Sequence, residues 1–401
     1  MNNKKFNGRR LSTARKYRGL GITDLSRLVG ISKQSLSLYE KNENIPPYEN
    51  VALLANALKF PYEFFVTEEK CETITSNTYF RSQASVTKKQ RLAQTIKLEY
   101  IAKIYEIFLD YVDFPQVNLP NINFESGNKT DEYDSNMVAE EIERISSTVR
   151  EYWKLGKEPI ENLQYILEKN GIIVTGFEEV SNKIDAFSQR ILGSDSIYRY
   201  IIAVALGTKP ETRLRFDMAH ELGHILLHKW EEKTDDLQKD EFNGIEKQAN
   251  MFASAFLLPR DSFGKEISLY PTDLSYYSYL KKKWKVSMQA MMYRTYQLEI
   301  ITTNQFQYLM RRVSKNGWRN HEPGDKPGTI NNTIFQGAID ILFENGYLDA
   351  KTLMQDFREK GIVMWPNEIE NLLHLKEGSL EIQDNVVPII KLKSKLNRDE
   401  E

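Results

Sequence analysis

Two histidines and a glutamate stand close together near the middle of the chain, in Ala219-His-Glu-Leu-Gly-His-Ile-Leu-Leu-His228. If this segment is a helix, His220 and His224 lie one turn apart on one face, so both imidazoles can reach one metal ion. Glu221 projects beside them and can accept a proton. Catalytic zinc takes three protein ligands and leaves its fourth position to water. The His-Glu-x-x-His spacing therefore predicts two zinc ligands and a proton acceptor.

A third ligand is expected from a second helix that begins at Glu246. Its apolar residues recur at spacings of three and four, which indicates a helix: Ala249, Phe252, Ala253 and Phe256. Taken alone, Glu246 is an ordinary acidic residue at a helix start, where the helix dipole favours negative charge. The only cysteine, Cys71, allows neither an internal disulfide nor a sulfur-rich metal site. The zinc site must therefore consist of histidine and carboxylate.

These residues resemble the ImmA/IrrE family of bacterial zinc metallopeptidases. The matching stretches are A-H-E-L-G-H-x-L-L-H and E-x-x-A-N-x-F-A-x-x-F-L-L-P. The resemblance implies that His220, His224 and Glu246 bind Zn2+ and that Glu221 is the general base. His228 also matches a histidine usual in the family, and we interpret it as lying near the ligands or at the helix end. Relatives cleave repressor proteins, so the implied substrate is a specific DNA-binding protein.

Charge is distributed unevenly along the 401 residues. Residues 1–60 hold 11 Lys and Arg against 4 Asp and Glu, a balance of +7 within a total of -2. Such asymmetry favours a nucleic-acid-binding end attached to a mildly acidic body, although a basic segment can also be only a solvated surface. There is no apolar run of 18 residues and no signal-peptide pattern, and cysteine is scarce. We expect a cytoplasmic protein that does not enter a membrane.

Residues 7–66 are predicted to form five short helices, including a helix, a glycine turn and a second helix, which define a helix-turn-helix. This region resembles the XRE family of repressor-like DNA-binding domains. The resemblance places Lys33, Gln34 and Ser35 at the start of the helix that reads bases. It also implies a buried Arg15–Glu40 ion pair and core positions at Leu36 and Tyr39. Ile22 departs from the phosphate-contacting Gln of many relatives. The alternative is a domain retained for protein–protein contact.

The remaining segments alternate between helical and extended patterns. Residues 67–90 are polar and are expected to be a connector, and 88–112 are expected to form a long amphipathic helix. That helix either holds two subunits together as a homodimer or packs on the peptidase; the sequence does not choose. Further segments are predicted as helices at 137–153, 160–169, 270–298, 338–343 and 348–358, and as strands at 171–176, 184–191 and 198–206.

The expected fold is therefore mainly α with a small sheet (α+β), in which a zincin-like cleft lies between the sheet and the metal-binding helix. We divide the chain into an XRE-like domain (1–70), a connector with the long helix (71–135), a metallopeptidase domain (136–320) and a C-terminal region of unreadable role (321–401).

The sequence predicts a zinc-dependent endopeptidase that regulates transcription by cleaving a partner repressor. Zinc would lower the pKa of its bound water toward ~7, and Glu221 would transfer the proton. His228, Tyr293 and Arg294 are candidate donors to the oxyanion. One alternative is a DNA-binding regulator whose peptidase fold only senses or binds a partner. Another is one component of a toxin–antitoxin or phage-defence pair.

Overall fold

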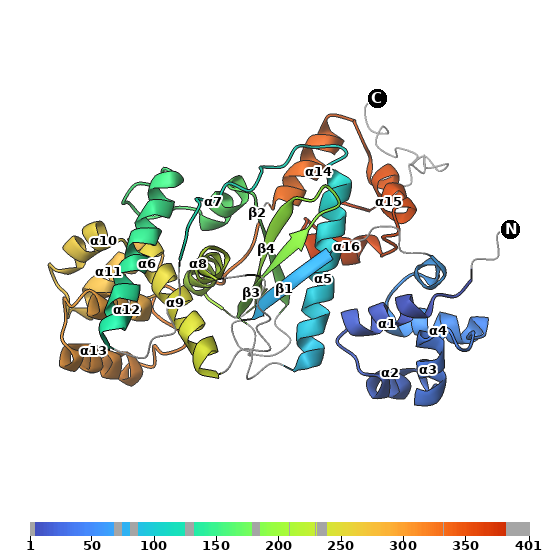
Figure 1. Cartoon of the computed structure of the whole chain (residues 1–401), viewed down its shortest axis with the longest axis horizontal. Helices are drawn as coiled ribbons and strands as arrows, with labels where there is room; N and C mark the ends of the chain where they lie inside the picture. The colour runs from blue at the N-terminus through green and yellow to red at the C-terminus, as the bar shows by residue number, and fades with distance from the viewer. Residues whose placement is uncertain are drawn as a thin grey trace, which may run out of the picture.

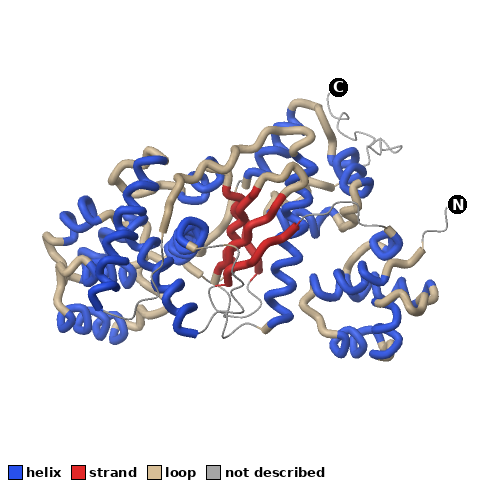
Figure 2. The backbone as a smooth tube through the Cα atoms, viewed as in Figure 1, coloured by secondary structure: helices blue, strands red, loops and turns tan. Residues whose placement is uncertain are grey.

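The computed structural model describes residues 5–67, 74–80, 87–124, 132–178, 185–207, 209–228, 230, 239–331 and 333–381. Helices dominate these residues, and a small sheet lies near the centre of the molecule (Figures 1 and 2). The predicted fold class, mainly α with a small sheet, is confirmed. Cys71 and residue 184 lie outside the described residues, as do the last twenty residues of the C-terminal region. Among the described residues, no helix is long and apolar enough to cross a membrane.

The N-terminal lobe consists of short helices, as the sequence predicts. They are α1 (Gly8–Tyr17), α2 (Ile22–Val29), α3 (Lys33–Glu40), α4 (Tyr48–Leu58) and the 3-10 helix η1 (Tyr62–Val66). Ser32 caps α3 by accepting a hydrogen bond from Ser35 N, and Gly30 ends α2 with a φ of 73°, which a glycine adopts readily. Leu36 and Tyr39 are buried, and Arg15 Nε lies 2.6 Å from Glu40 Oε1. The expected core positions and ion pair are confirmed.

The central sheet has four strands in the order β1-β3-β4-β2. Their bounds are β1 Ile74–Phe80, β2 Ile172–Glu178, β3 Ala186–Leu192 and β4 Tyr198–Leu206. Strands β1 and β3, and β3 and β4, pair antiparallel, whereas β2 and β4 pair parallel. The prediction that residues 67–90 form a connector is wrong for Ile74–Phe80, which form β1. An edge strand is stabilised by pairing with a strand that is distant in the sequence, here β3. Such pairing cannot be recognised from the local amino-acid composition.

Helices cover both faces of the sheet, giving three layers. One face packs against α5 (Lys88–Phe108) and the C-terminal helices α14 (Ile334–Glu344), α15 (Ala350–Glu359) and α16 (Pro366–Leu373). The other packs against a group of helices that continues to the far end of the molecule: α6 (Glu132–Tyr152), α7 (Leu163–Lys169), α8 (Glu211–Leu227), α9 (Lys239–Leu257), α10 (Arg260–Ile267), α11 (Leu274–Trp284), α12 (Met288–Gln297) and α13 (Thr303–Lys315).

Helix α5 stands between the sheet and the N-terminal lobe (Figure 1). It is buried on most sides from Tyr100 to Phe108, and its apolar residues join the lobe, one sheet face and α14–α16 in one continuous core. The sequence left open whether this helix holds two subunits together or packs on the peptidase. The structure decides this in part, because α5 packs within its own chain. The single helix expected over 270–298 is wrong, since Lys285 (φ 54°) separates α11 from α12, which starts at the cap Ser287.

Candidate functional site

The candidate site lies on α8, which starts after Pro210 and packs against β3 and β4. His220, Glu221 and His224 are all at most 1 % exposed. Each offers one ligand atom within 4.8 Å of the other two. The two imidazole Nε2 atoms face each other at 3.0 Å, as expected for histidines one helical turn apart.

Glu246 reaches the two histidines from α9, which packs along α8. Its Oε2 lies 3.4 Å from His220 Nε2, and its Oε1 lies 3.2 Å from His224 Nε2. Helix α9 begins at Lys239, so the prediction that Glu246 starts the helix is wrong. The close approach of the helices depends on Gly223, because a Cβ there would lie 3.2 Å from Ala249 Cα. Glycine at this position therefore lets α9 bring its carboxylate to α8.

The three donors fit a tetrahedral zinc site. Zinc binds imidazole nitrogen and carboxylate oxygen at about 2.0–2.2 Å, so two ligands of one ion stand about 3.3 Å apart. The separations among His220, His224 and Glu246 are 3.0, 3.2 and 3.4 Å. Two neutral imidazoles and one carboxylate form a donor set that zinc accepts at catalytic sites. These side chains could thus hold one zinc ion with little rearrangement.

A second set of side chains orients the two imidazoles. Asn250 Oδ1 lies 3.1 Å from His220 Nδ1, and the Asn250 amide donates to the Glu246 carbonyl at 2.8 Å. His224 Nδ1 lies 2.9 Å from His228 Nδ1, and His228 Nε2 lies 3.1 Å from Gln248 Oε1. Because an amide oxygen only accepts, this chain is satisfied when His228 carries its proton on Nε2 and His224 carries its proton on Nδ1. Both ligand Nε2 atoms are then left as acceptors for a metal.

His228 is therefore a supporting residue, in agreement with its interpretation from the sequence. Burial, with a smaller contribution from His224, lowers the pKa of His228 to about 3. An imidazole with so low a pKa stays neutral, which is the state that the hydrogen-bond chain requires. Both ring nitrogens of His228 are bonded, to His224 and to Gln248, and His228 does not line the cavity beside Glu246, so it is a poor candidate for the oxyanion donor.

Glu221 is fixed from the sheet side. Ser188, on β3, donates a hydrogen bond of 2.7 Å from Oγ to Glu221 Oε2. Ser188 and Glu221 are both fully buried. The sheet thus orients the carboxylate that the motif places beside the two histidines. Sequence reasoning did not identify Ser188 as a candidate functional residue, nor Asn250 and Gln248, and nothing in the pattern of β3 distinguishes this serine from other small strand residues.

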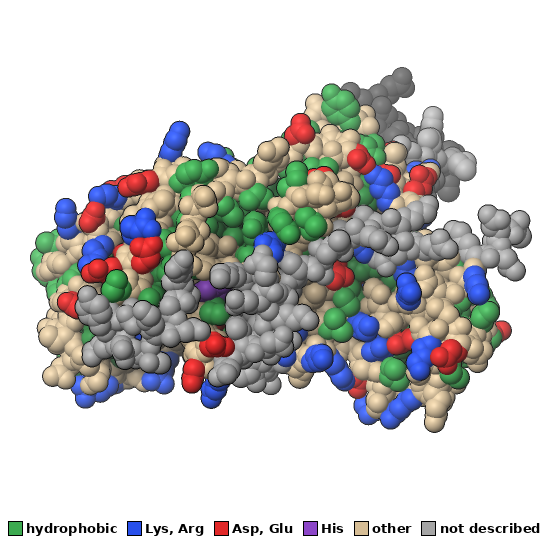
Figure 3. Space-filling view, in the orientation of Figure 1, with side chains coloured by type: hydrophobic (Ala, Val, Ile, Leu, Met, Phe, Trp, Pro, Cys, Tyr) green, Lys and Arg blue, Asp and Glu red, His purple; other side chains and the backbone are tan. Residues whose placement is uncertain are grey.

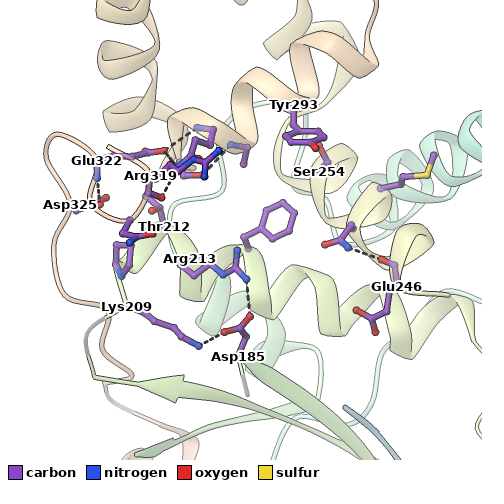
Figure 4. Close-up of a pocket in the computed structure, with 18 of the residues that line it drawn as sticks. Asp185, Lys209, Thr212, Arg213, Glu246, Ser254, Tyr293, Arg319, Glu322 and Asp325 are labelled. Carbon is purple, nitrogen blue, oxygen red and sulfur yellow. Dashed lines mark hydrogen bonds and ion pairs between the residues drawn. The ribbon is translucent and has the colours of Figure 1, made fainter. Parts of the chain in front are cut away.

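A cavity of about 1000 Å³ opens beside Glu246 and Asn250 (Figure 4). One wall carries a cluster in which Asp185 accepts from Lys209 at 2.5 Å and from Arg213 at 2.9 Å. The opposite wall comes from α12 and from the segment after α13, with Tyr293, Arg319, Glu322 and Asp325 labelled in Figure 4. The cavity is large enough for several residues of an extended peptide, and most of the residues that line it have polar side chains.

The structure separates the candidate oxyanion donors. Tyr293 lines the cavity and is 55 % exposed. Arg294 is buried, donates to the Leu258 carbonyl and pairs with Glu143, so it does not belong to the cavity wall. Tyr293 is thus the one of these two that could reach a substrate.

The N-terminal lobe presents a second candidate site. Lys33 and Gln34 are exposed at the start of α3, and Ser35 is partly exposed with its hydroxyl 2.9 Å from Ser32 Oγ. The start of a recognition helix is where side chains contact base edges in helix-turn-helix proteins. Lys33 and Gln34 are therefore accessible to DNA, whereas the ion pair between α1 and α3 serves only the core of the lobe.

Comparison with protein families finds a match for each of the two regions that carry these candidate sites. Residues 171–296 match the family described as IrrE N-terminal-like domain, of peptidase family M78. Residues 171–296 are therefore similar to a metallopeptidase-like domain. Residues 8–69 match a family described as helix-turn-helix domain, so the two resemblances seen in the sequence are confirmed. No curated protein matches the chain. The two matches together support a DNA-binding regulator with an ImmA/IrrE-type, metallopeptidase-like domain.

Proposed function

We propose that this chain is a zinc-dependent endopeptidase that regulates transcription by cleaving a specific repressor-like DNA-binding protein. The observation that carries the proposal is the convergence of His220, His224 and Glu246 within 3.0–3.4 Å of one another, beside an oriented Glu221. The cavity next to these residues offers room for a peptide segment. The helix-turn-helix domain would bring the enzyme to DNA, where repressors are found.

In the proposed reaction, His220, His224 and Glu246 hold the zinc ion, and Glu221 handles the proton. Bound zinc would supply a water of lowered pKa and would polarise the peptide carbonyl. Glu221 accepts the proton of that water at its carboxylate and later delivers it to the leaving amine. Ser188 holds the carboxylate in the orientation for both transfers. Tyr293 is the candidate donor to the oxyanion from the cavity wall.

A second candidate function is a regulator whose peptidase fold binds a partner without cutting it. The continuous core that joins the helix-turn-helix lobe, α5 and the sheet favours this alternative, because it couples the candidate active site physically to the DNA-binding lobe. We also propose that the chain divides at about residues 70, 135 and 320, with the C-terminal helices serving as a support for the lobe and the sheet.

Metal content and cleavage together test the two functions. The purified chain and a Glu221→Gln variant would be analysed for zinc and incubated with a repressor-like protein encoded beside this chain's gene. We expect one zinc per chain in both and cleavage only by the wild type, because glutamine cannot accept the proton. Zinc without cleavage under any condition would favour the regulator. A chain that binds no zinc would exclude the endopeptidase.

A further inference from the structure

The first helix of the helix-turn-helix, α2, has a carboxylate at its N-terminus. Asp24 Oδ2 accepts a hydrogen bond of 2.8 Å from Gly21 N. In helix-turn-helix complexes this first helix crosses the sugar-phosphate backbone, and free N–H groups at a helix start are good phosphate ligands. Here the carboxylate occupies the Gly21 N–H and would repel a phosphate, and the residue that starts α2 is the apolar Ile22. Helix α2 by itself is therefore poorly equipped to contact DNA.

A lysine from outside the lobe lies at this position. Lys89, in the first turn of α5, places Nζ 2.6 Å from Asp24 Oδ2. It also lies so close to Gly21 that a Cβ there would be 2.7 Å from Nζ. The Lys89 side chain is still 56 % exposed, and the neighbouring Lys88 is exposed as well. Its hydrogen bond holds the pKa of Asp24 below the usual range. The start of α5 thus replaces a negative surface with a positive one.

These lysines do not serve the stability of α5. Basic residues in a first turn oppose the helix dipole, which favours acidic residues there. Helix α5 has no acidic residue in its first turn, and its start is instead fixed by the capping box of Thr87 and Gln90. The capping box thus fixes the helix start at which Lys88 and Lys89 lie, although the helix dipole disfavours positive charge there. Lys89 pairs with Asp24 within the fold, but the helix start holds two lysines against this one carboxylate, so positive charge is left over for a negatively charged partner.

The start of α5 faces the same side of the molecule as the helix-turn-helix. In Figure 1 the lower end of α5 lies beside α2, and α2 and α3 form the lower side of the lobe. Lys and Arg side chains gather on this side of the lobe and at its junction with the rest of the chain in Figure 3. Lys33, at the start of α3, is also exposed. A duplex read by α3 would therefore pass the start of α5.

We propose that Lys88 and Lys89 contact the phosphate backbone of the DNA that α3 reads, so that the DNA-binding surface extends beyond the helix-turn-helix domain. The inference rests on the proposed DNA binding. Phosphate contacts hold a protein in register without reading sequence, which leaves specificity to α3. Lys89 has two tasks, because it neutralises Asp24 and offers its remaining N–H groups to a phosphate.

Phosphate contacts can be counted without knowing the operator, because they are independent of sequence. The intact chain would be titrated against a fluorescent duplex of mixed sequence, about 30 base pairs long, over a series of KCl concentrations. For a Lys88→Gln/Lys89→Gln variant we expect the slope of log K against log salt to fall by about 2, and affinity near 0.1 M salt to fall roughly ten- to hundredfold. Lys282→Gln, an exposed lysine on α11, is the matched control and should change neither quantity.

An Asp24→Asn variant tests the same idea with the opposite sign. Asparagine can still accept from Gly21 N, but it has no charge, so affinity should rise. An unchanged slope in the Lys88/Lys89 variant would overturn the inference, and so would an equal loss in the Lys282 control. A wild-type chain that binds no duplex would instead refute the DNA binding on which it rests. A third outcome separates the two claims. If the Lys33→Gln/Gln34→Ala variant loses DNA binding while the Lys88/Lys89 variant keeps the wild-type affinity and slope, DNA binding is supported and only the inference is refuted.

Discussion

Ser188 Oγ lies 2.7 Å from Glu221 Oε2 and connects strand β3 to helix α8 inside the buried site. A hydroxyl that donates to one carboxylate oxygen restricts the orientation of the carboxylate. Under the proposed mechanism, Glu221 must hold this orientation while a proton is accepted and then delivered. Ser188 is thus a positioning residue that acts through Glu221.

Replacing Ser188 with alanine should lower kcat for the proposed peptide cleavage roughly 10- to 100-fold, because hydrogen bonds to charged groups contribute about 1.5–3 kcal/mol. KM and zinc content should change little, since Ser188 contacts neither the cavity nor the three metal ligands. Steady-state kinetics with metal analysis on the same samples would measure all three. Ser146→Ala is a control, because Ser146 on α6 is also buried but does not line the cavity. A Ser188→Ala chain that lost its zinc would assign this serine a structural role.

The sequence predicted helix α8 and its cluster of candidate metal ligands because that information is local. His220, Glu221 and His224 stand within five consecutive residues, and helical geometry alone brings them together. Ser188 could not be found in this way. It lies 33 residues before Glu221, and the two meet only because α8 packs on the sheet. Glu246 could be identified only because it belongs to a second motif that accompanies the first. Its distance from the histidines depends on how closely α9 approaches α8 at Gly223, which helical geometry alone does not predict.

Removing the support of a ligand should weaken metal binding. Asn250→Ala takes away the acceptor 3.1 Å from His220 Nδ1, so the ring loses its fixed tautomer and orientation. We expect zinc affinity to fall about 10- to 100-fold, the usual effect of losing such a partner. Competition with a chromophoric chelator measures it. Asn243→Ala makes the same change on the same helix at an exposed residue of the cavity rim. Equal losses in the two variants would contradict the prediction.

The place of the C-terminal helices was beyond sequence reasoning for the same physical reason. Arg18, which follows the last residue of α1, forms two hydrogen bonds of 2.9 Å with Glu368 of α16, and Tyr17 donates to Glu368 at 2.8 Å. These partners are 350 residues apart, so no local pattern relates them. Helix α16 itself was not predicted, and its one buried face completes a core formed by α5 and the N-terminal lobe.

A double-mutant cycle on Arg18 and Glu368 should therefore give a coupling free energy of roughly 1–3 kcal/mol, because the pair is two-pronged and mostly shielded from water. Unfolding of Arg18→Ala, Glu368→Ala and the double variant in urea would supply the three values. The Lys157–Asp261 pair is the control, since both side chains are more than half exposed, and its coupling should stay below about 0.5 kcal/mol. Similar coupling free energies in both pairs would show that the Arg18–Glu368 contact stabilises the chain no more than an exposed ion pair does.

Stability should fall as pH rises from about 4.5 to about 8, because of Glu168. This residue of α7 is 6 % exposed beside the start of α14, and burial raises its pKa to about 8 in spite of bonds from Gln164 and Ile334 N. Between pH 4.5 and 8 the folded chain holds a proton that the unfolded chain releases. The stabilisation is thus complete below pH 4.5 and disappears as pH passes the folded pKa, a change of roughly 3–5 kcal/mol.

Glu168→Gln removes this titration while keeping an oxygen that can accept from Ile334 N. Urea unfolding at intervals from pH 5 to pH 9 should show a weaker pH dependence in the variant than in the wild type, and a more stable variant at the alkaline end. Glu344→Gln, an exposed residue at the other end of α14, should retain the wild-type profile. If Glu168→Gln and the wild type lose stability in parallel over this range, the carboxylate is ionised in the folded chain and its burial is compensated by the start of α14.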